Sequence, residues 1–310
     1  MTSLKFLTGP CRSSLLVYIL AVICLTPTLI AAQGRDDDVI TVDSSIVLIN
    51  AAVTDRSGKA VPGLMQRQFH VFEDGSEQEI KTFAAEQTPF AAVILIDSSG
   101  SMESRISMAR SAAIRFLDGL RSSDVAAVYH FASKVDMIQD FSSSRDIAEK
   151  VFDVKADGMT VLNDAVFQAA NLLAKRPENR RAIIVLSDGE DTMSGNSAEK
   201  ALRAALAAGA TIYTVDMSST DEVNNRRALN QGVLKNFATR SGGTFVEATG
   251  GPELRDAFKR IVEELGSQYT IAYQPKEAKK DGKWHAIEVR IDKANLTIRS
   301  RKGYHAPKGK

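Results

Sequence analysis

The chain has 310 residues, of which 44% are hydrophobic and 25% are charged, and its formal net charge at pH 7 is +1. This composition is typical of a globular protein and excludes a largely disordered chain. The near balance of charge gives no indication of nucleic-acid binding, and the length is sufficient for one large domain and a smaller one.

The first 32 residues have the three-part layout of a secretory signal peptide. Lys5 and Arg12 precede the uncharged run from Leu15 to Leu25, and small residues end at Ala32. We therefore expect residues 1–32 to be removed on export to the periplasm, the cell envelope or the medium, which would leave no membrane span. The alternative is an uncleaved anchor, because the 18 uncharged residues 15–32 are close to the minimum of about 17 that cross a bilayer. Both cysteines lie in this segment, so the mature chain has no disulfide and no thiolate metal ligand.

An acidic linker at residues 33–39 is followed by a β pattern over residues 40–89. Apolar residues alternate in SIVLINAAVTD, and two short runs in FHVFEDGSEQEIKTF flank the pair Asp74 and Gly75. An Asp-Gly pair between two such runs is typical of a two-residue hairpin turn. We expect strands here, because no helical period appears.

Residues 90–267 alternate apolar runs with amphipathic helices. The expected strands are FAAVILID, VAAVYHFA, AIIVLSD, TIYTVDM and GTFVEA. Between them apolar residues recur at helical spacing, for example at Ile106, Ala109, Ala113 and Phe116. Strands that are apolar throughout, with helices between them, predict a doubly wound α/β domain with a mostly parallel sheet covered on both faces.

Residues 268–310 return to a β pattern, with YTIAY and IEVRID as expected strands. Each β segment is too small to bury a core by itself. We therefore predict that segments 40–89 and 268–310 meet in one β-sandwich, with the α/β domain inserted between them. Trp284 is expected in the core of this sandwich, with carbohydrate contact as the alternative.

The stretch AVILIDSSGSMES places a carboxylate and two hydroxyls at the end of an expected strand. Asp97, Ser99 and Ser101 alternate along the loop, so their oxygen atoms can converge, and such oxygen ligands suit Mg²⁺ or Mn²⁺. The alternative is that both serines cap the next helix. Two more loops supply matching groups, since Thr160 precedes an expected helix and Asp188 follows another apolar strand. Ligands of open α/β sheets bind beyond such strand ends.

These three loops, in this order and spacing, resemble the von Willebrand factor A domain and its metal-ion-dependent adhesion site. The resemblance implies that five residues coordinate one Mg²⁺ or Mn²⁺, directly or through water: Asp97, Ser99, Ser101, Thr160 and Asp188. It also implies a non-enzymatic binding module, whose metal holds an Asp or Glu carboxylate of a protein partner. Met159 departs from the family pattern, in which a second glycine often precedes the threonine, and leaves the ligands in place.

The segments around this domain resemble the secreted bacterial proteins of the acidobacterial-type VWFA-related family. The likeness lies in VTDRSGKAVPGLMQRQFHVFEDGSEQEI before the domain and in YTIAYQP, DGKWHAIEVRI and RSRKGYHAP after it. It implies the same architecture and metal chemistry, and it names no partner.

A metal-assisted hydrolase is the alternative to a binding module. Its general base would be Glu190 or Asp191, beside the metal. The stretch DSSGS is no GxSxG nucleophile motif, and the sequence contains no glycine-rich nucleotide-binding motif. The four histidines show no spacing typical of a metal site, so no catalytic residue is assigned.

Charge is divided unevenly along the chain. Residues 269–310 contain 11 basic and 4 acidic residues, whereas residues 33–268 contain 26 basic and 34 acidic residues. One interpretation is a set of solvated strand edges on which lysines discourage pairing with other chains. The alternative is contact between the basic C-terminal segment and an anionic surface such as lipopolysaccharide.

Overall fold

The structure is a computed structural model that describes residues 46–85, 88–218, 225–247, 251–277 and 280–309. The predicted signal peptide and acidic linker, residues 1–39, lie outside the described residues. The described residues all belong to one compact unit, Asp43–Lys310. None of the described helices is both long and apolar enough to cross a membrane.

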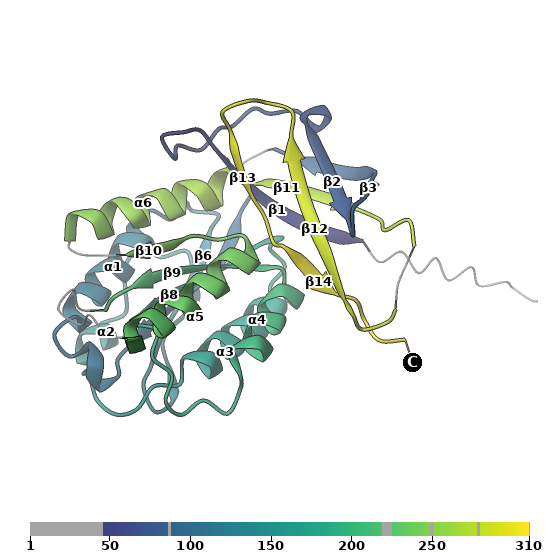
Figure 1. The fold of residues 1–310 in the computed structure, drawn as a ribbon. Coiled ribbons are helices and arrows are strands. Elements are labelled where there is room, and N and C mark those ends of the chain that lie inside the picture. Colours follow the sequence, from purple (N-terminus) through teal and green to yellow (C-terminus); the bar gives the residue numbers. More distant parts are fainter. Residues whose placement is uncertain (1–45, 86–87, 219–224, 248–250, 278–279, 310) are drawn as a thin grey trace, which may run out of the picture. The chain divides into compact units, whose positions relative to one another are not determined.

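A six-stranded sheet forms the centre of the α/β domain (Figure 1). In spatial order its strands are β10 (Phe245–Glu247), β9 (Ala210–Asp216), β8 (Arg180–Ser187), β5 (Phe90–Asp97), β6 (Val125–Phe131) and β7 (Val135–Ser142). All neighbours are parallel except β6 and β7, which confirms the predicted doubly wound, mostly parallel sheet. The sequence pattern does not indicate β7, because this antiparallel edge strand buries only Ile138.

Helices cover both faces of this sheet. They are α1 (Ile106–Asp118), α2 (Lys150–Asp153), α3 (Leu162–Ala174), α4 (Ala198–Ala207), α5 (Asn225–Ser241) and α6 (Gly251–Ser267). Helices α1 and α6 pack on one face, and α3, α4 and α5 pack on the other. Along β5, Ile94 and Ile96 belong to the first core, and Val93 and Leu95 belong to the second. A central strand buried on both faces therefore requires its unbroken apolar run.

The two β segments form two four-stranded sheets. One has the order β13 (Thr297–Arg299), β1 (Val47–Thr54), β11 (Tyr269–Tyr273) and β4 (Ile80–Ala84), and the other has β14 (Gly303–His305), β12 (Trp284–Ile291), β2 (Phe69–Glu73) and β3 (Ser76–Gln78). Each sheet takes strands from both ends of the chain, since β1 pairs with β11 and β2 pairs with β12. Apolar residues of both sheets share one core that includes Ile49, Val71, Ile271 and Val289. The predicted sandwich is confirmed.

The turn between β2 and β3 is the predicted two-residue hairpin. Glu73 pairs with Ser76, and Asp74 and Gly75 between them have φ values of +49° and +84°. Positive φ at both central residues is the geometry that favours Asp-Gly. This turn also places the Asp74 side chain beside β12, since its carboxylate accepts the N–H of Ala286 at 2.9 Å.

Trp284 lies outside the sandwich core, so that prediction is wrong. The buried positions of β12 are odd-numbered, among them Ile287 and Val289, and successive side chains of a strand point to opposite faces. Trp284 therefore faces the α/β domain, where it packs against the core beneath α3, α4 and α5 and lies 5.1 Å from the guanidinium of Arg240. Trp284 thus contributes to the contact between the sandwich and the α/β domain.

Arg180 joins the α/β domain to the sandwich. It is fully buried, and its guanidinium donates to the Thr270 hydroxyl at 3.3 Å, to the Gly266 carbonyl at 3.2 Å and to the Gln268 carbonyl. Burial, helped by the nearby Arg121, lowers the pKa of Arg180 to about 10. Because a buried charge needs satisfied hydrogen bonds, these contacts fix the start of β11 against β8.

Candidate metal centre

The predicted ligands lie at one edge of the central sheet, where three parallel neighbouring strands end together. Strand β5 ends at Asp97, β8 ends at Ser187 and β9 ends at Asp216. This is the carboxyl edge, at which open α/β sheets bind their ligands. Asp97 ends β5, and Ser99, Ser101 and Asp188 lie in the loops that leave this edge. The loop before α3 brings Thr160 to the same edge.

Asp97 is fully buried, and both of its carboxylate oxygens accept hydrogen bonds. Oδ1 accepts from the Ser99 N–H at 2.9 Å and from the Ser99 hydroxyl at 2.6 Å, and Oδ2 accepts from the Ser187 hydroxyl at 2.5 Å. The hydroxyl oxygens of Ser99 and Ser101 are 3.1 Å apart. Hydrogen bonds and short contacts thus connect the side-chain oxygens of Asp97, Ser99 and Ser101.

The two serines do not cap the following helix. Helix α1 has Arg105 as its N-cap residue. The short 3₁₀ turn Gly100–Met102 has Ser99 before it, but the Ser99 side chain makes no capping hydrogen bond to this turn. The capping alternative is therefore wrong, and the Ser99 hydroxyl is directed to Asp97 instead.

Thr160 lies in the adjacent loop before α3 and is 2% exposed. Its N–H donates to the Thr192 hydroxyl at 2.8 Å, which ties it to the loop that follows β8. Two residues earlier, the Gly158 carbonyl accepts the N–H of Gly100 at 3.2 Å, which holds the Thr160 loop against the Ser99 to Ser101 loop. Gly158 has a φ of +81°, a conformation that favours glycine.

Asp188 follows β8 directly and is buried. Its carboxylate accepts the N–H of Glu190 at 3.0 Å. Gly189 has a φ of +82°, and a Cβ there would lie 2.6 Å from the carbonyl oxygen of Asn230 in α5. The turn after Asp188 therefore packs against α5 as only glycine permits.

The charge of this site is uncompensated. Burial raises the pKa of Asp97 to about 7, and the nearby Asp188 adds to this rise against the opposing hydrogen bonds from Ser187 and Ser99. No lysine or arginine of the described chain forms an ion pair with Asp97. Two buried carboxylates without a cationic partner are costly, and a divalent cation with oxygen ligands supplies the missing charge. The donor set therefore fits Mg²⁺ or Mn²⁺.

The two acidic residues considered as general bases differ in their surroundings. Asp191 is engaged within its loop, where Oδ1 accepts the Ser194 N–H at 3.1 Å and Oδ2 accepts the Asn163 N–H at 2.8 Å and the Ser194 hydroxyl at 2.7 Å. Glu190 instead lines a pocket beside the predicted ligands. The hydrolase alternative therefore depends on Glu190.

This pocket has a volume of about 300 Å³ and includes Ser101 and Asp188 in its wall. The rest of its lining is polar: Glu190, Ser218, Arg226, Arg227 and Asn230. Except for Glu190, sequence reasoning missed these residues, because no spacing connects them to Asp97. One residue in the sequence could have indicated this pocket: Asp216, a polar residue near the end of the expected strand TIYTVDM. In the structure its carboxylate accepts the Ser218 N–H at 2.8 Å and the Gln231 amide at 2.6 Å.

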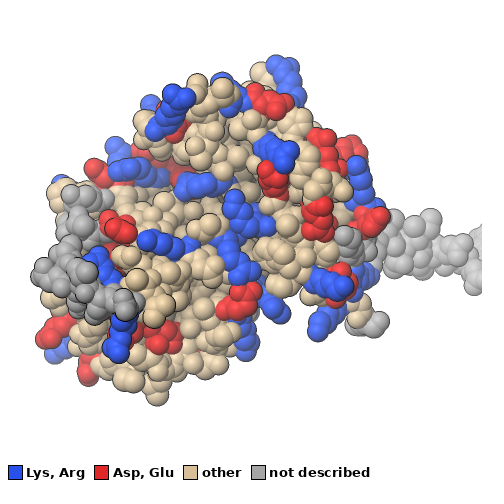
Figure 2. All heavy atoms as spheres, viewed as in Figure 1, with Lys and Arg blue, Asp and Glu red and all other residues tan. Residues whose placement is uncertain are grey.

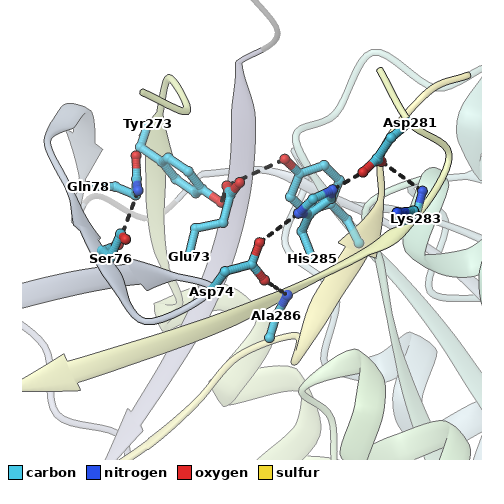
Figure 3. A network of polar contacts seen from close by, with 10 residues as sticks. Glu73, Asp74, Ser76, Gln78, Tyr273, Asp281, Lys283, His285 and Ala286 are labelled. Carbon is cyan, nitrogen blue, oxygen red and sulfur yellow. Dashed lines mark hydrogen bonds and ion pairs between the residues drawn. The ribbon is translucent and has the colours of Figure 1, made fainter. Parts of the chain in front are cut away.

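A second polar cluster lies in the sandwich (Figure 3). His285 contacts the Asp74 carboxylate through Nδ1 at 2.7 Å and the Asp281 carboxylate through Nε2 at 3.2 Å. Next to Asp74, the Glu73 carboxylate accepts the Tyr273 hydroxyl at 2.6 Å. Glu73, Asp74 and His285 bring possible ligand atoms within 4.8 Å of one another. Sequence spacing does not indicate this cluster, because 211 residues separate Asp74 from His285.

The bonding of His285 favours a structural role for this second cluster. Burial by itself lowers the pKa of His285, but the hydrogen bonds to Asp74 and Asp281 outweigh it and raise the pKa. The raised pKa favours the protonated imidazole, which donates from both ring nitrogens to the two carboxylates and leaves no lone pair for a metal. The cluster therefore ties the β2–β3 turn to β12, which come from opposite ends of the chain.

Several arginines of the basic C-terminal segment are engaged in contacts within the protein. Arg299 pairs with Glu264, Arg290 pairs with Glu288 at 2.8 Å, and Arg301 donates to the Leu206 carbonyl at 3.3 Å. On the face shown in Figure 2, basic and acidic side chains of the described residues are interspersed. Contact with an anionic surface stays a prediction.

Comparison with known families agrees with this geometry. Residues 92–190 match the model of the von Willebrand factor type A domain, and this stretch includes all five predicted ligands. The chain contains a von Willebrand factor type A domain. The match covers the first part of the α/β domain and none of the sandwich, so the narrower resemblance to the acidobacterial-type family stays a prediction. A search of the curated proteins found no match.

Solved structures similar to this chain are distant in sequence. A von Willebrand factor type A protein from Catenulispora acidiphila is 14% identical over 86% of this chain and 75% of its own, with a TM-score of 0.48. Three N-terminal domains of the type V pili tip protein Mfa5 from Porphyromonas gingivalis are 12% identical over 84% and 68%, with a TM-score of 0.49. An aerotolerance-related membrane protein from Bacteroides fragilis is 19% identical over 57% and 98%, with a TM-score of 0.47. Likenesses of this size say nothing about function.

Proposed function

We propose that this protein is a cation-dependent binding module, exported to the periplasm, the cell envelope or the medium. In this proposal Asp97, Ser99, Ser101, Thr160 and Asp188 hold one Mg²⁺ or Mn²⁺. When bound, the cation supplies an open coordination position to an Asp or Glu carboxylate of a protein partner. The observation that carries the proposal is the buried carboxylate of Asp97, which lies near Asp188 at the carboxyl edge without a basic partner.

The composition of the ligand set supports an acidic partner group. Three of the five ligands are neutral hydroxyls, so the two carboxylates at most neutralise the cation and leave positive charge when only one of them coordinates directly. Mg²⁺ requires near-octahedral oxygen geometry, and a site at a protein edge leaves a position for an incoming oxygen. A carboxylate of a partner satisfies both the geometry and the charge.

A calorimetric titration with Mg²⁺ and with Mn²⁺ tests the metal site. Wild type is expected to bind one ion, and Asp188→Ala is expected to bind none while it keeps its circular dichroism spectrum. Asp118→Ala is the matched control, because Asp118 is an exposed residue at the end of α1 and its loss changes the net charge equally. A wild-type protein that binds neither ion would reject the proposal.

A cross-linking pull-down from the native cell envelope tests the partner. We expect capture by wild type in Mg²⁺ and its loss both in EDTA and with Asp188→Ala. Asp118→Ala should capture the same proteins as wild type. Equal capture by Asp188→Ala and by wild type would show that binding does not pass through the cation.

A further inference from the structure

We propose that the pocket beside the metal centre is an acid-binding subsite, so that the partner presents two acidic side chains rather than one. The inference rests on the proposed function, because the first acidic group is the one held by the cation. Arg226 receives the second, with help from the Ser218 hydroxyl. The resulting partner is a peptide segment with a spaced pair of Asp or Glu residues.

The order of strands places this pocket directly beside the predicted ligands. Strands β5, β8 and β9 are neighbours, and Ser101, Asp188 and Ser218 lie in the loops that follow them in the same order. The three residues line one pocket together with Arg226 and Arg227 at the start of α5. A peptide whose carboxylate binds the cation held by Asp188 and Ser101 would therefore place a neighbouring side chain near the arginines.

The two arginines differ in whether a described acidic residue lies beside their guanidinium group. Arg227 is directed to the end of β9, with its guanidinium nitrogen 4.0 Å from Oδ2 of Asp216. Arg226 is exposed and forms no ion pair with any described residue. The guanidinium of Arg226 is thus available to a ligand, and a planar guanidinium suits bidentate recognition of a carboxylate.

The electrostatics of the pocket favour an anion once the cation is bound. The pocket wall carries two acidic residues, Asp188 and Glu190, and two arginines that form no ion pair with them, so a bound divalent cation makes the wall net positive. Both arginines lie in the first turn of α5, which contains no acidic residue. A helix N-terminus carries partial positive charge, so the guanidinium of Arg226 is unfavourable there until an anion joins it. Glu190 at the same wall favours a monoanionic carboxylate over a phosphate dianion.

Ser218 offers a hydrogen bond that the described residues leave unused. Its N–H donates to Asp216 at 2.8 Å, which fixes the residue at the end of β9. Its hydroxyl is buried and has no hydrogen-bond partner among the described residues, although the residue lines the pocket. Buried polar groups are nearly always paired, so a ligand oxygen is the natural acceptor for this hydroxyl.

Labelled synthetic peptides test the subsite by fluorescence anisotropy with the full chain in Mg²⁺. One peptide has a single glutamate among glycines, and the others have two glutamates separated by zero to three glycines. The best two-glutamate peptide is expected to bind wild type about tenfold more tightly than the single-glutamate peptide, the effect of one charge-assisted pair. Arg226→Ala should abolish this difference and leave single-glutamate binding unchanged. The matched control Arg260→Ala, at an exposed arginine of α6, should keep the difference.

The outcomes separate the subsite from the proposed function. If the single-glutamate peptide binds in Mg²⁺ but the second glutamate adds nothing, or its gain survives Arg226→Ala, the subsite is rejected and the metal function stands. If the single-glutamate peptide does not bind, the proposed function fails. Two-glutamate binding that persists in EDTA and is lost with Arg226→Ala would then support the subsite alone.

Discussion

The carboxyl edge of the sheet and the sandwich each bring carboxylates together around a buried side chain, but among the described residues only the sandwich provides a basic partner for them. At the edge, Asp97 and Asp188 lie close together without a basic partner, and the pKa of Asp97 rises to about 7 because it is buried. In the sandwich, His285 lies between Asp74 and Asp281, and its pKa rises because these carboxylates outweigh its burial. Figure 3 shows this second arrangement.

The presence or absence of a basic partner indicates which cluster needs a ligand to balance its charge. A cluster in which a raised histidine pKa favours an imidazolium between the carboxylates has its own counter-charge, so it gains less from an added cation. An uncompensated cluster is costly to keep and becomes favourable when a cation arrives. The same residue types therefore have different roles, and the presence or absence of an internal counter-charge separates them.

The largest expected effect is metal-dependent stabilisation at the edge. At a Mg²⁺ concentration of about 100 times Kd, the free energy of unfolding of wild type should rise by about 2.7 kcal/mol, because only the folded form binds the ion. Asp97→Asn should show no rise, and His285→Ala should show the full rise. Urea denaturation with Mg²⁺ and with EDTA measures all three. A rise in Asp97→Asn equal to that of wild type would remove Asp97 from the site.

The next effect concerns the sandwich. His285→Ala is expected to lower the free energy of unfolding by about 2 kcal/mol, because the carboxylates of Asp74 and Asp281 lose their shared partner. Thermal and urea denaturation in EDTA measure the loss. Unchanged stability would show that the cluster is not the structural tie we infer, and would reopen it as a ligand site.

The pH dependence of stability without metal should differ between the clusters. The folded protein keeps a proton on Asp97 up to about pH 7, whereas the unfolded chain loses it near the ordinary pKa of 3.8. The stability that this proton contributes is complete below that value and is lost as pH rises toward 7. The His285 contribution is complete below the ordinary pKa of 6.5 and is lost as pH rises through the raised pKa.

Denaturation across pH 4 to about pH 9 in EDTA checks these signs. The stability difference between wild type and Asp97→Asn should change between about pH 4 and pH 7, and that for His285→Ala should change above about pH 6.5. Mg²⁺ affinity should show the opposite trend and weaken as pH falls below about 7, because the proton competes for Asp97. Affinity that is constant over this range would contradict the raised pKa.

The smallest effect is expected at the exposed counterpart of His285. His70 also lies between two carboxylates, with 2.7 Å contacts to Glu77 and Asp292, but its side chain is 36% exposed. Hydrogen bonds to Glu77 and Asp292 raise the pKa of His70, yet water and salt screen exposed pairs. His70→Ala should therefore lower the free energy of unfolding by less than about 1 kcal/mol, measured beside His285→Ala. A larger loss for His70 would show that burial does not set the difference.

The local sequence determined the elements and the proposed ligands. Unbroken apolar runs identify β5, β8 and β9, because a strand buried on both faces excludes polar residues. Asp74 and Gly75 mark the hairpin, since its turn requires positive φ at both positions. Asp97, Ser99 and Ser101 stand out because polar groups follow such a run directly. Each of these signals spans only a few residues, and over that distance the local backbone geometry alone determines how the side chains lie relative to one another.

Tertiary structure decided what lies beside these elements. Strand β7 carries too few buried residues to show a pattern, and Trp284 packs toward α5 rather than into the sandwich. The pairing of Asp74 with His285, and the placement of Arg226 and Ser218 next to Asp188, join residues from distant parts of the chain. These contacts follow from strand order and from the faces that packed elements present to each other. Sequence periodicity reports which face of an element is buried, and only the assembled fold decides what that face meets.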